Sequence, residues 1–496
     1  MDMNTIHRIG MCLTVLLCTA CGTEKIKNAE RVEAFPDIYP DYVGVTIPAT
    51  LSPLPFSMTD STCRKLDVVF RGADGQEIHT QGAAVTDIPP ERWRRLLAGN
   101  VGDSLSVRVF AKFADGWKSY RPFGIYISAD AIDYGLNYRL IAPGYEVYSK
   151  MGIYERDLSS FEERVLIENT QFEGCVNCHS YNRCRPTDLS LHIRGAHGAT
   201  LLQKDGQMKA YDTATDSTLA LCVYPYWHPS GNYIAYSTNH TRQGFHIQQD
   251  KLIEVFDLAS DLQVYDIRTN ELVTVPHLKR DSVWETFPAF SPDGRSLYFC
   301  AAAARPIPTE VKEVRYNLCR VDFDPGTCAF GAKIDTLIHA ESAGKSVSFP
   351  RPSYDGRYLL YTLADYGQFS VWHHEADLWM LDLQTGENRR LDEVNSCDTE
   401  SYHSWSSNSR WFVFGSRRDD GLHTRAYIAH CDTDGKIGKP FMLPQPNPKH
   451  YYDNHFRSYN VLEFVCDPVS FDRLAAEKLI ETKDRVQMKY RQGEVR

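Results

Sequence analysis

The C-terminal half of the chain repeats one short pattern four times, and no other feature restricts the fold as strongly. Each copy places an aromatic residue or a proline before a polar turn, and an alternating apolar strand after it. The copies are 227–236, 290–299, 352–361 and 405–414. Their turn anchors, Gly231, Gly294, Gly356 and Ser409, lie 63, 62 and 53 residues apart. A repeat at such a period indicates one structural unit that is stacked several times.

A second pair of strands around another turn follows most copies, for example at 263–272 and 378–387. Four strands per repeat are typical of the blades of a β-propeller. One blade cannot bury both faces of its sheet, so blades must stack around an axis. Segments 200–211 and 459–465 supply weaker parts of further blades. We therefore expect a β-propeller over 199–466 with about six blades.

The repeats resemble those of TolB-like propellers, over roughly 200–465. Two rival families need motifs that this chain lacks. A sialidase box requires Ser-x-Asp-x-Gly-x-Thr-Trp, and the segment 291–295 does not continue in that way. A prolyl-peptidase propeller is joined to a hydrolase domain with Gly-x-Ser-x-Gly, which the sequence does not contain. The charged tail 467–496 is expected to form a docked surface helix.

The region 36–140 shows period-two apolar runs, at 65–70 and 106–113. Asp-Gly turns at 74–75 and 115–116 follow these runs, and such pairs are hairpin signals. Two hairpins in a region of this size predict a small N-terminal β-sandwich, so the whole chain should be mainly β.

The N-terminus reads as an export signal. A short apolar stretch at 11–20 follows two basic residues and precedes Cys21 and a polar segment. This resembles a bacterial lipoprotein signal over 1–21, which implies that Cys21 is lipidated and that 22–35 is a tether. The pattern departs from the family at Cys18, where leucine is preferred. The alternative is an ordinary cleaved signal with an incidental cysteine.

Composition excludes some classes of partner. The formal net charge is −10, which argues against a broad electrostatic attraction to nucleic acid. After the N-terminus no apolar run is long enough to predict a transmembrane helix. Two of the 14 cysteines lie in the signal, Cys21 is assigned to lipid, and Cys175 and Cys178 belong to a Cys-x-x-Cys-His motif. The remaining cysteines are odd in number, so at least one should be unpaired within the chain.

The chemistry is concentrated at Cys175-Val176-Asn177-Cys178-His179, the attachment signature of a c-type haem. Two thiols at this spacing can each add to one of the two vinyl groups on one edge of the macrocycle. His179 then provides an axial imidazole to the iron. We expect one covalent haem c, held in a short, irregular and partly helical segment at 141–198. A capping box at 160–163 predicts that helical part, through Asn169.

Other interpretations of the two thiols are a redox pair or a zinc site. A redox pair would follow a strand in a βαβ pattern, which this sequence lacks. Zinc would need more ligands, and Cys184 with His192 or His197 offers them. A simple disulfide is the remaining alternative.

The sequence does not decide which residue is the second axial ligand. His192 is the first candidate and His197 the second, and Met151 and Met208 offer thioethers. A methionine ligand would raise the reduction potential relative to two histidines. Arg194 is a candidate partner for a haem propionate, because a guanidinium pairs well with carboxylates.

The order of haem motif and propeller resembles a group of Bacteroidetes envelope lipoproteins. The resemblance implies a lipid-anchored electron carrier of the cell envelope, at the outer membrane facing the periplasm, whose propeller docks an unknown redox or envelope protein. The alternative is a TolB-like scaffold that binds a protein or a glycan and has no redox role. An open iron site would instead permit haem enzyme chemistry.

Overall fold

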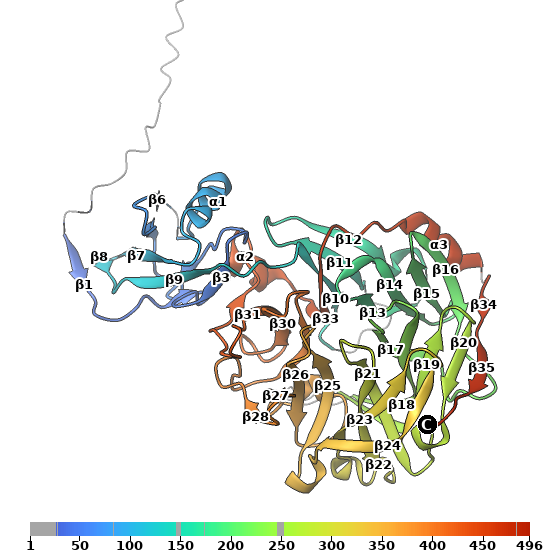
Figure 1. The fold of residues 1–496 in the computed structure, drawn as a ribbon. Helices are drawn as coiled ribbons and strands as arrows, with labels where there is room; N and C mark the ends of the chain where they lie inside the picture. Colours follow the sequence, from blue (N-terminus) through green and yellow to red (C-terminus); the bar gives the residue numbers. More distant parts are fainter. Residues whose placement is uncertain are drawn as a thin grey trace, which may run out of the picture.

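The computed structural model describes residues 26, 28–82, 84–144, 150–172, 174–245, 252–482 and 484–496. The signal at 1–21, with Cys21, and tether residues 22–25 and 27 lie outside these ranges. The described chain is mainly β, as expected, with an N-terminal sheet domain beside a six-bladed propeller (Figure 1). No helix in the described part of the chain is long and apolar enough to cross a membrane.

The N-terminal domain contains one seven-stranded sheet, and this differs from the expected β-sandwich. Its strands are β1 (Ala29–Arg31), β3 (Thr46–Pro48), β5 (Lys65–Arg71), β6 (Glu77–Gln81), β7 (Ser104–Phe113), β8 (Gly116–Ser119) and β9 (Phe123–Ser128). A separate pair is β2 (Ile38–Tyr39) and β4 (Ser57–Met58). Both predicted hairpins form, but β7 is long enough to pair with β8 and β9 in succession, so the hairpins share one sheet.

Helix α1 (Pro90–Ala98) packs against this sheet through Trp93, Leu96 and Leu97. The ring of Trp93 lies 5.5 Å from that of Phe70, edge to face. β1 pairs in parallel with β8, so part of the segment expected to be a tether is a strand.

The N-terminal domain and the propeller share a continuous apolar core, which includes Ile47 on one side and Trp411 on the other. Polar contacts extend this junction. Asp130 contacts the ring of His430, with 2.6 Å between Oδ2 and Nε2. Trp411 Nε1 donates to the carbonyl of Asp130 at 3.3 Å.

Six four-stranded blades form the propeller, and the strands of each blade are named in order from the innermost outward. Blade 1 contains β33 (Ser458–Val465), β10 (Gly135–Ile141), β11 (Gly152–Asp157) and β12 (Glu163–Glu168). Blade 2 contains β13 (Cys175–Asn182), β14 (Arg185–Arg194), β15 (Ala199–Lys204) and β16 (Gln207–Asp212). Blade 3 contains β17 (Cys222–Trp227), β18 (Tyr233–Phe245), β19 (Ile253–Asp266) and β20 (Glu271–Thr274).

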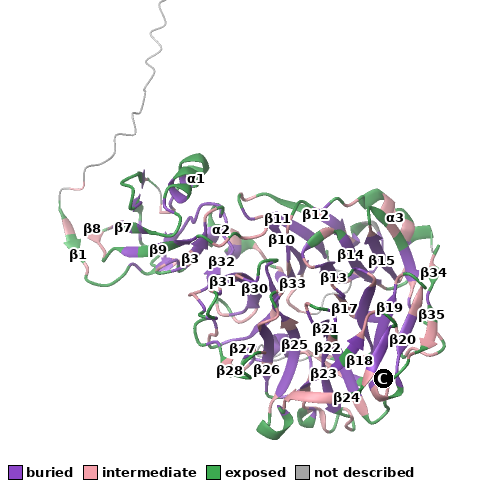
Figure 2. Cartoon of the chain, in the orientation of Figure 1, coloured by how far each residue is buried: buried purple, intermediate pink, exposed green. Residues whose placement is uncertain are grey.

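The remaining blades follow the chain order. Blade 4 contains β21 (Val283–Phe290), β22 (Ser296–Ala303), β23 (Asn317–Asp324) and β24 (Ala329–Ile338). Blade 5 contains β25 (Ser346–Pro352), β26 (Tyr358–Ala364), β27 (Asp377–Asp382) and β28 (Asn388–Arg390). Blade 6 contains β29 (Glu400–Trp405), β30 (Trp411–Ser416), β31 (Arg425–His430) and β32 (Phe441–Met442). Buried residues follow these strands, and exposed ones lie mainly in the loops (Figure 2).

The propeller begins earlier than its repeats predict, at Gly135 instead of residue 199. Strand β33, from near the C-terminus, pairs antiparallel with β10 and closes the ring. The segment 141–198 is therefore part of blades 1 and 2, and the helix expected after Ser160 is strand β12. Pairing of β12 with β11 outweighs the local helix signal, and Ser160 Oγ instead accepts a hydrogen bond from the N–H of Glu162 within a turn.

Short helices and the tail complete the fold. The 3-10 turns are η1 (Asn169–Gln171), η2 (Pro276–Leu278), η3 (Val311–Glu313), η4 (Glu341–Ala343) and η5 (Ser370–Trp372). Helix α2 (Pro448–Asn454) precedes β33. The tail forms the expected helix, α3 (Arg473–Thr482), and then adds β34 (Val486–Gln487) and β35 (Lys489–Gln492) to the outer edges of blades 2 and 3.

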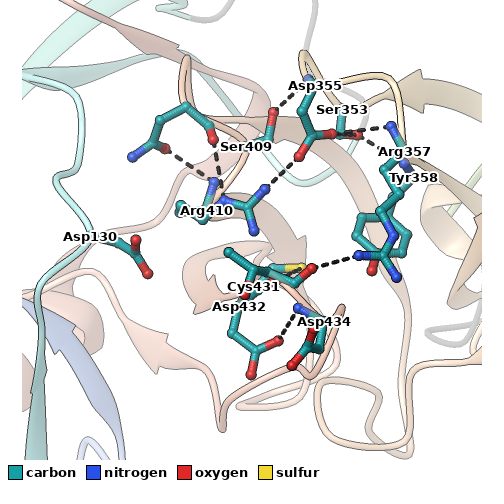
Figure 3. Close-up of polar contacts among 12 residues, drawn as sticks. Asp130, Ser353, Asp355, Arg357, Tyr358, Ser409, Arg410, Cys431, Asp432 and Asp434 are labelled. Atoms are coloured by element: carbon teal, nitrogen blue, oxygen red, sulfur yellow. Dashed lines mark hydrogen bonds and ion pairs between the residues drawn. The ribbon is translucent and has the colours of Figure 1, made fainter.

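The repeated turn makes the same hydrogen bonds in three blades, which explains why its residues recur. In blade 5, Ser353 Oγ donates to Asp355 Oδ1 at 2.6 Å, and the N–H of Arg357 donates to the same oxygen at 3.1 Å (Figure 3). The N–H of Tyr358 donates to Ser353 Oγ at 2.9 Å. Equivalent contacts are made by Ser291, Asp293, Arg295 and Ser296, and by Ser406, Asn408, Arg410 and Trp411. A serine and an Asp or Asn at fixed spacing satisfy the turn backbone.

The same turns also join neighbouring blades. The N–H of Asp355 donates to Ser409 Oγ at 3.0 Å, and the guanidinium of Arg410 forms an ion pair with Asp355 (Figure 3). Arg357 Nη1 donates to the carbonyl of Thr433 at 2.6 Å. The repeat therefore encodes both the turn and its contact with the next blade.

Candidate functional site

The Cys-x-x-Cys-His motif forms the start of β13, the innermost strand of blade 2. Alternation along a regular strand would place Cys175 and Cys178 on opposite faces. A β-bulge interrupts the pairing with β14 between Val176 and His179. Both thiols, with His179, consequently line one cavity on the propeller axis.

The innermost strand of every blade has an irregularity of this kind. In four blades an aromatic residue with positive φ occupies it, and we call these residues the aromatic arc: Tyr224, Phe287, Phe349 and Tyr402. Their successive ring centroids are 4.5, 4.4 and 4.7 Å apart.

Two blades depart from the aromatic arc. In blade 1 the positive-φ residue is Val461. In blade 2 the residue at the equivalent place, immediately after the last residue paired before the bulge, is Asn177. These two smaller side chains are adjacent in the ring, because β33 and β13 are neighbouring innermost strands. Both of these residues line the same cavity as the motif.

The axial cavity has a volume of about 510 Å³, within the usual range for a small-molecule or cofactor site. Its lining combines members of the aromatic arc with four arginines, Arg139, Arg194, Arg351 and Arg417. No described residue of the lining is Asp or Glu. The chain as a whole carries a formal charge of −10, so this concentration of positive charge is local.

His179 is 2% exposed and faces this cavity. Neither of its ring nitrogens makes a hydrogen bond of ordinary geometry with another described residue. Burial lowers the pKa of His179 to about 3, with a contribution from Arg139 and opposition from the backbone of Asn137. The imidazole is therefore neutral, which is the form that binds a metal ion.

Arg139, on β10, lies beside the motif. Its Nη2 donates to Cys175 Sγ at 3.2 Å and contacts Met151 Sδ at 3.5 Å. Its Nη1 donates to Asn177 Oδ1 at 3.1 Å. Met151 also lines the cavity. Blade 1 thus contributes a guanidinium and a thioether next to the thiols of blade 2, and the motif by itself did not indicate Arg139.

His192 and His197 do not line the cavity. His192 is buried on β14, where its Nδ1 lies 3.2 Å from Thr200 Oγ1. It follows Leu191, the partner of His179, so alternation turns its side chain to the other face of the sheet. Met208 packs at the edge of an apolar cluster in blade 2. Of the residues considered for the second axial position, the structure brings only Met151 to the cavity.

Arg194 does line the cavity, and its backbone pairs directly with that of Cys175. Cys184 lies elsewhere, in a smaller cavity of about 30 Å³ on the axis, where its Sγ is 3.8 Å from the hydroxyl of Tyr354. The described residues contain no group of three or more His, Cys, Asp or Glu side chains that could hold a metal ion. The ligand set considered for zinc is therefore not assembled.

Comparisons with known proteins assign no family to this chain. No protein-family model matches the chain, and no curated protein matches it. Among solved structures, an ancestral GH74 enzyme matches at 9% identity and a TM-score of 0.37, over 63% of this chain and 40% of that one. A puromycin-hydrolyzing peptidase of Mycobacterium tuberculosis matches at 12% identity and a TM-score of 0.35, over 81% of this chain and 57% of that one. A DUF4784 family protein of Bacteroides caccae matches at 9% identity and a TM-score of 0.31, over 74% of this chain and 96% of that one.

Proposed function

We propose that the axial cavity holds one c-type haem, attached through Cys175 and Cys178 and ligated by His179. The observation that carries this proposal is that all three side chains line one cavity, although they lie on a β-strand. The bulge at β13 is what makes this convergence possible. The buried, neutral His179 makes no hydrogen bond of ordinary geometry with a described residue, which suits it to bind iron.

The rest of the cavity suits the same group. Aromatic side chains provide apolar walls for a flat macrocycle and limit access of water. The arginines offer partners for its carboxylates. Arg139 orients Cys175 and Asn177. Met151 replaces His192 as our candidate for the second axial ligand, since it lines the cavity and His192 does not.

When bound, such a haem supplies reversible one-electron exchange at its iron. We therefore propose that the protein is an electron carrier of the bacterial cell envelope. In this proposal the lipidated Cys21 anchors it, at the outer membrane facing the periplasm, and the propeller docks an unidentified redox or envelope protein. The signal-like sequence and the motif support this assignment.

The proposal is tested by whether haem is covalently attached to the protein. The full chain is expressed with a cytochrome c maturation system, denatured, and stained for haem on a gel. We expect a stained band that Cys175→Ser and Cys178→Ser each weaken and that the double variant abolishes. Cys397→Ser is the matched control, because Cys397 is exposed and does not line the cavity. A colourless wild-type band, in cells that mature a control cytochrome, contradicts the proposal.

A propeller that binds an envelope protein or a glycan without any redox role is the second candidate. The cavity's positive charge favours it, because that charge suits an anionic ligand whether or not haem is attached. A colourless protein that still binds an anion in the cavity would support this candidate instead.

A further inference from the structure

Arg417 is a buried cation without a carboxylate partner among the described residues. It follows β30 in blade 6, is 3% exposed and lines the axial cavity. Its guanidinium stacks on the ring of Trp372, 3.0 Å from the centroid, and its Nε donates to Thr424 Oγ1 at 3.3 Å. No described Asp or Glu forms an ion pair with it.

The nearest acids are already occupied. Asp398 and Asp420 attract Arg417 at a distance, but Asp398 contacts His374 Nδ1 at 2.9 Å and Asp420 contacts His423 Nδ1 at 2.8 Å. Burial lowers the pKa of Arg417 to about 9. A charged group is costly to bury unless it is paired, so a guanidinium held in this way gains most from an anionic ligand.

Arg417 and the motif lie on different walls of the cavity. The innermost strands are neighbours in the order β13, β17, β21, β25, β29 and β33. Trp372 belongs to η5, in the β26–β27 connection of blade 5, three blades away from blade 2 in a ring of six. The side of the cavity that Trp372 lines is therefore opposite the side that carries Cys175 and Cys178. Arg194, by contrast, pairs with Cys175 and lies on the same wall as the thiols.

From this placement we infer that Arg417, supported by Trp372, binds a carboxylate of the ligand that fills the axial cavity. Arg is suited to this role because its planar donors match the two oxygens of a carboxylate. The residue expected from sequence for this contact, Arg194, instead lies beside Cys175.

The carboxylate has two sources. One is a haem propionate, which rests on the proposed function: the propionates leave the macrocycle on the edge opposite the vinyl groups, so thiols on one wall direct them toward the other. The second is a free carboxylate with an apolar body, which the aromatic lining would accommodate without attached haem.

The experiment uses the full chain carrying Cys175→Ser and Cys178→Ser, so that every ligand binds reversibly. Three probes are titrated: haemin, haemin dimethyl ester, whose propionates are blocked, and benzoate. Each titration is repeated with Arg417→Gln, with Arg417→Lys and with Arg320→Gln. Arg320 is a control because it forms a partly exposed ion pair with Asp335 and does not line the cavity. Thermal unfolding shows whether each variant is folded.

We expect Arg417→Gln to weaken haemin or benzoate binding about ten- to a hundredfold, as for loss of a charge-assisted hydrogen bond. Arg417→Lys should fall between wild type and Arg417→Gln. An effect on haemin but not on its ester identifies the propionate as the source, and an effect on benzoate identifies a free carboxylate. Three results would overturn the inference: Arg417→Gln binds haemin and benzoate as tightly as wild type does, the variant loses as much affinity for the dimethyl ester as for haemin, or no probe binds at all. Covalent haem in the wild-type chain is a separate measurement, so failure of the proposed function is recognised independently.

Discussion

Arg139 donates a hydrogen bond from Nη2 to the Sγ of Cys175 at 3.2 Å, so a guanidinium from blade 1 holds the first thiol of a motif in blade 2. The same side chain donates to Asn177. These contacts make Arg139 a positioning residue for the strand that carries the motif.

Replacing this positioning residue should reduce haem attachment. We expect Arg139→Gln to lower the ratio of covalent haem to protein by about tenfold, by analogy with the loss of an outer contact that orients a metal ligand. The ratio is measured by absorbance after purification, with Arg320→Gln as the control. An unchanged ratio in a folded Arg139→Gln protein would show that Arg139 does not position Cys175.

The second axial ligand is tested by comparing Met151 with His192. Met151→Ala should change the visible spectrum of the haem protein and open the iron to carbon monoxide. His192→Ala should leave the spectrum unchanged, because His192 does not line the cavity. A changed spectrum in His192→Ala together with an unchanged one in Met151→Ala would restore the expectation from sequence.

Burial of Asp257 should make stability depend on pH. The carboxylate is 1% exposed and accepts hydrogen bonds from Asn239, Tyr316 and Gln368. Burial outweighs these bonds and raises the pKa of Asp257 to about 7. An unfolded Asp titrates near 3.9, roughly, so between these values the folded state binds more protons. The protonated form of Asp257 therefore contributes to the stability of the folded state in full below about pH 4, and this contribution is lost as the pH rises to about 7.

Asp257→Asn removes this titration. We expect the free energy of unfolding of the variant, relative to wild type, to increase between pH 4 and 8 by up to about 4 kcal/mol, at roughly 1.4 kcal/mol per pKa unit. Urea unfolding at several pH values measures it. The difference from wild type is the quantity to follow, because burial also raises the pKa of Glu285 to about 8 and of Glu463 to about 7. A difference that stays constant with pH contradicts the prediction.

The propeller turns need glycine for two separable reasons. Gly356 has φ +78°, and an added Cβ would meet only Pro292 Cγ, at 4.0 Å. Gly294 has φ +71°, and its Cβ would lie 2.1 Å from His228 Nε2. We expect Gly356→Ala to cost about 1–2 kcal/mol for the left-handed conformation, and Gly294→Ala to cost more because of the clash. Gly124→Ala is the control: its φ is not positive and its nearest contact would be at 3.9 Å. Equal costs in denaturant unfolding for all three would contradict this interpretation.

The sequence alone determined those features that depend on contacts between near neighbours. In three of the turns the serine, the Asp or Asn and the residue at the left-handed position bond to one another within about six positions, so their spacing is visible in the repeats and predicts the propeller. The Cys-x-x-Cys-His motif is equally local. The helix predicted after Ser160 failed because pairing with β11 overrides local propensity.

Only the tertiary structure decided where the site lies and which residues share it. Strand β33 closes the ring against β10 across more than three hundred residues of chain, and no local pattern marks that pairing. The bulge in β13 turns both thiols toward the axis, and His192 is turned away by one step of alternation. Arg139, Met151 and Arg417 reach the same cavity from blades 1 and 6. A propeller axis is formed by six separate strands, so its lining is a property of the closed ring and not of any segment of sequence.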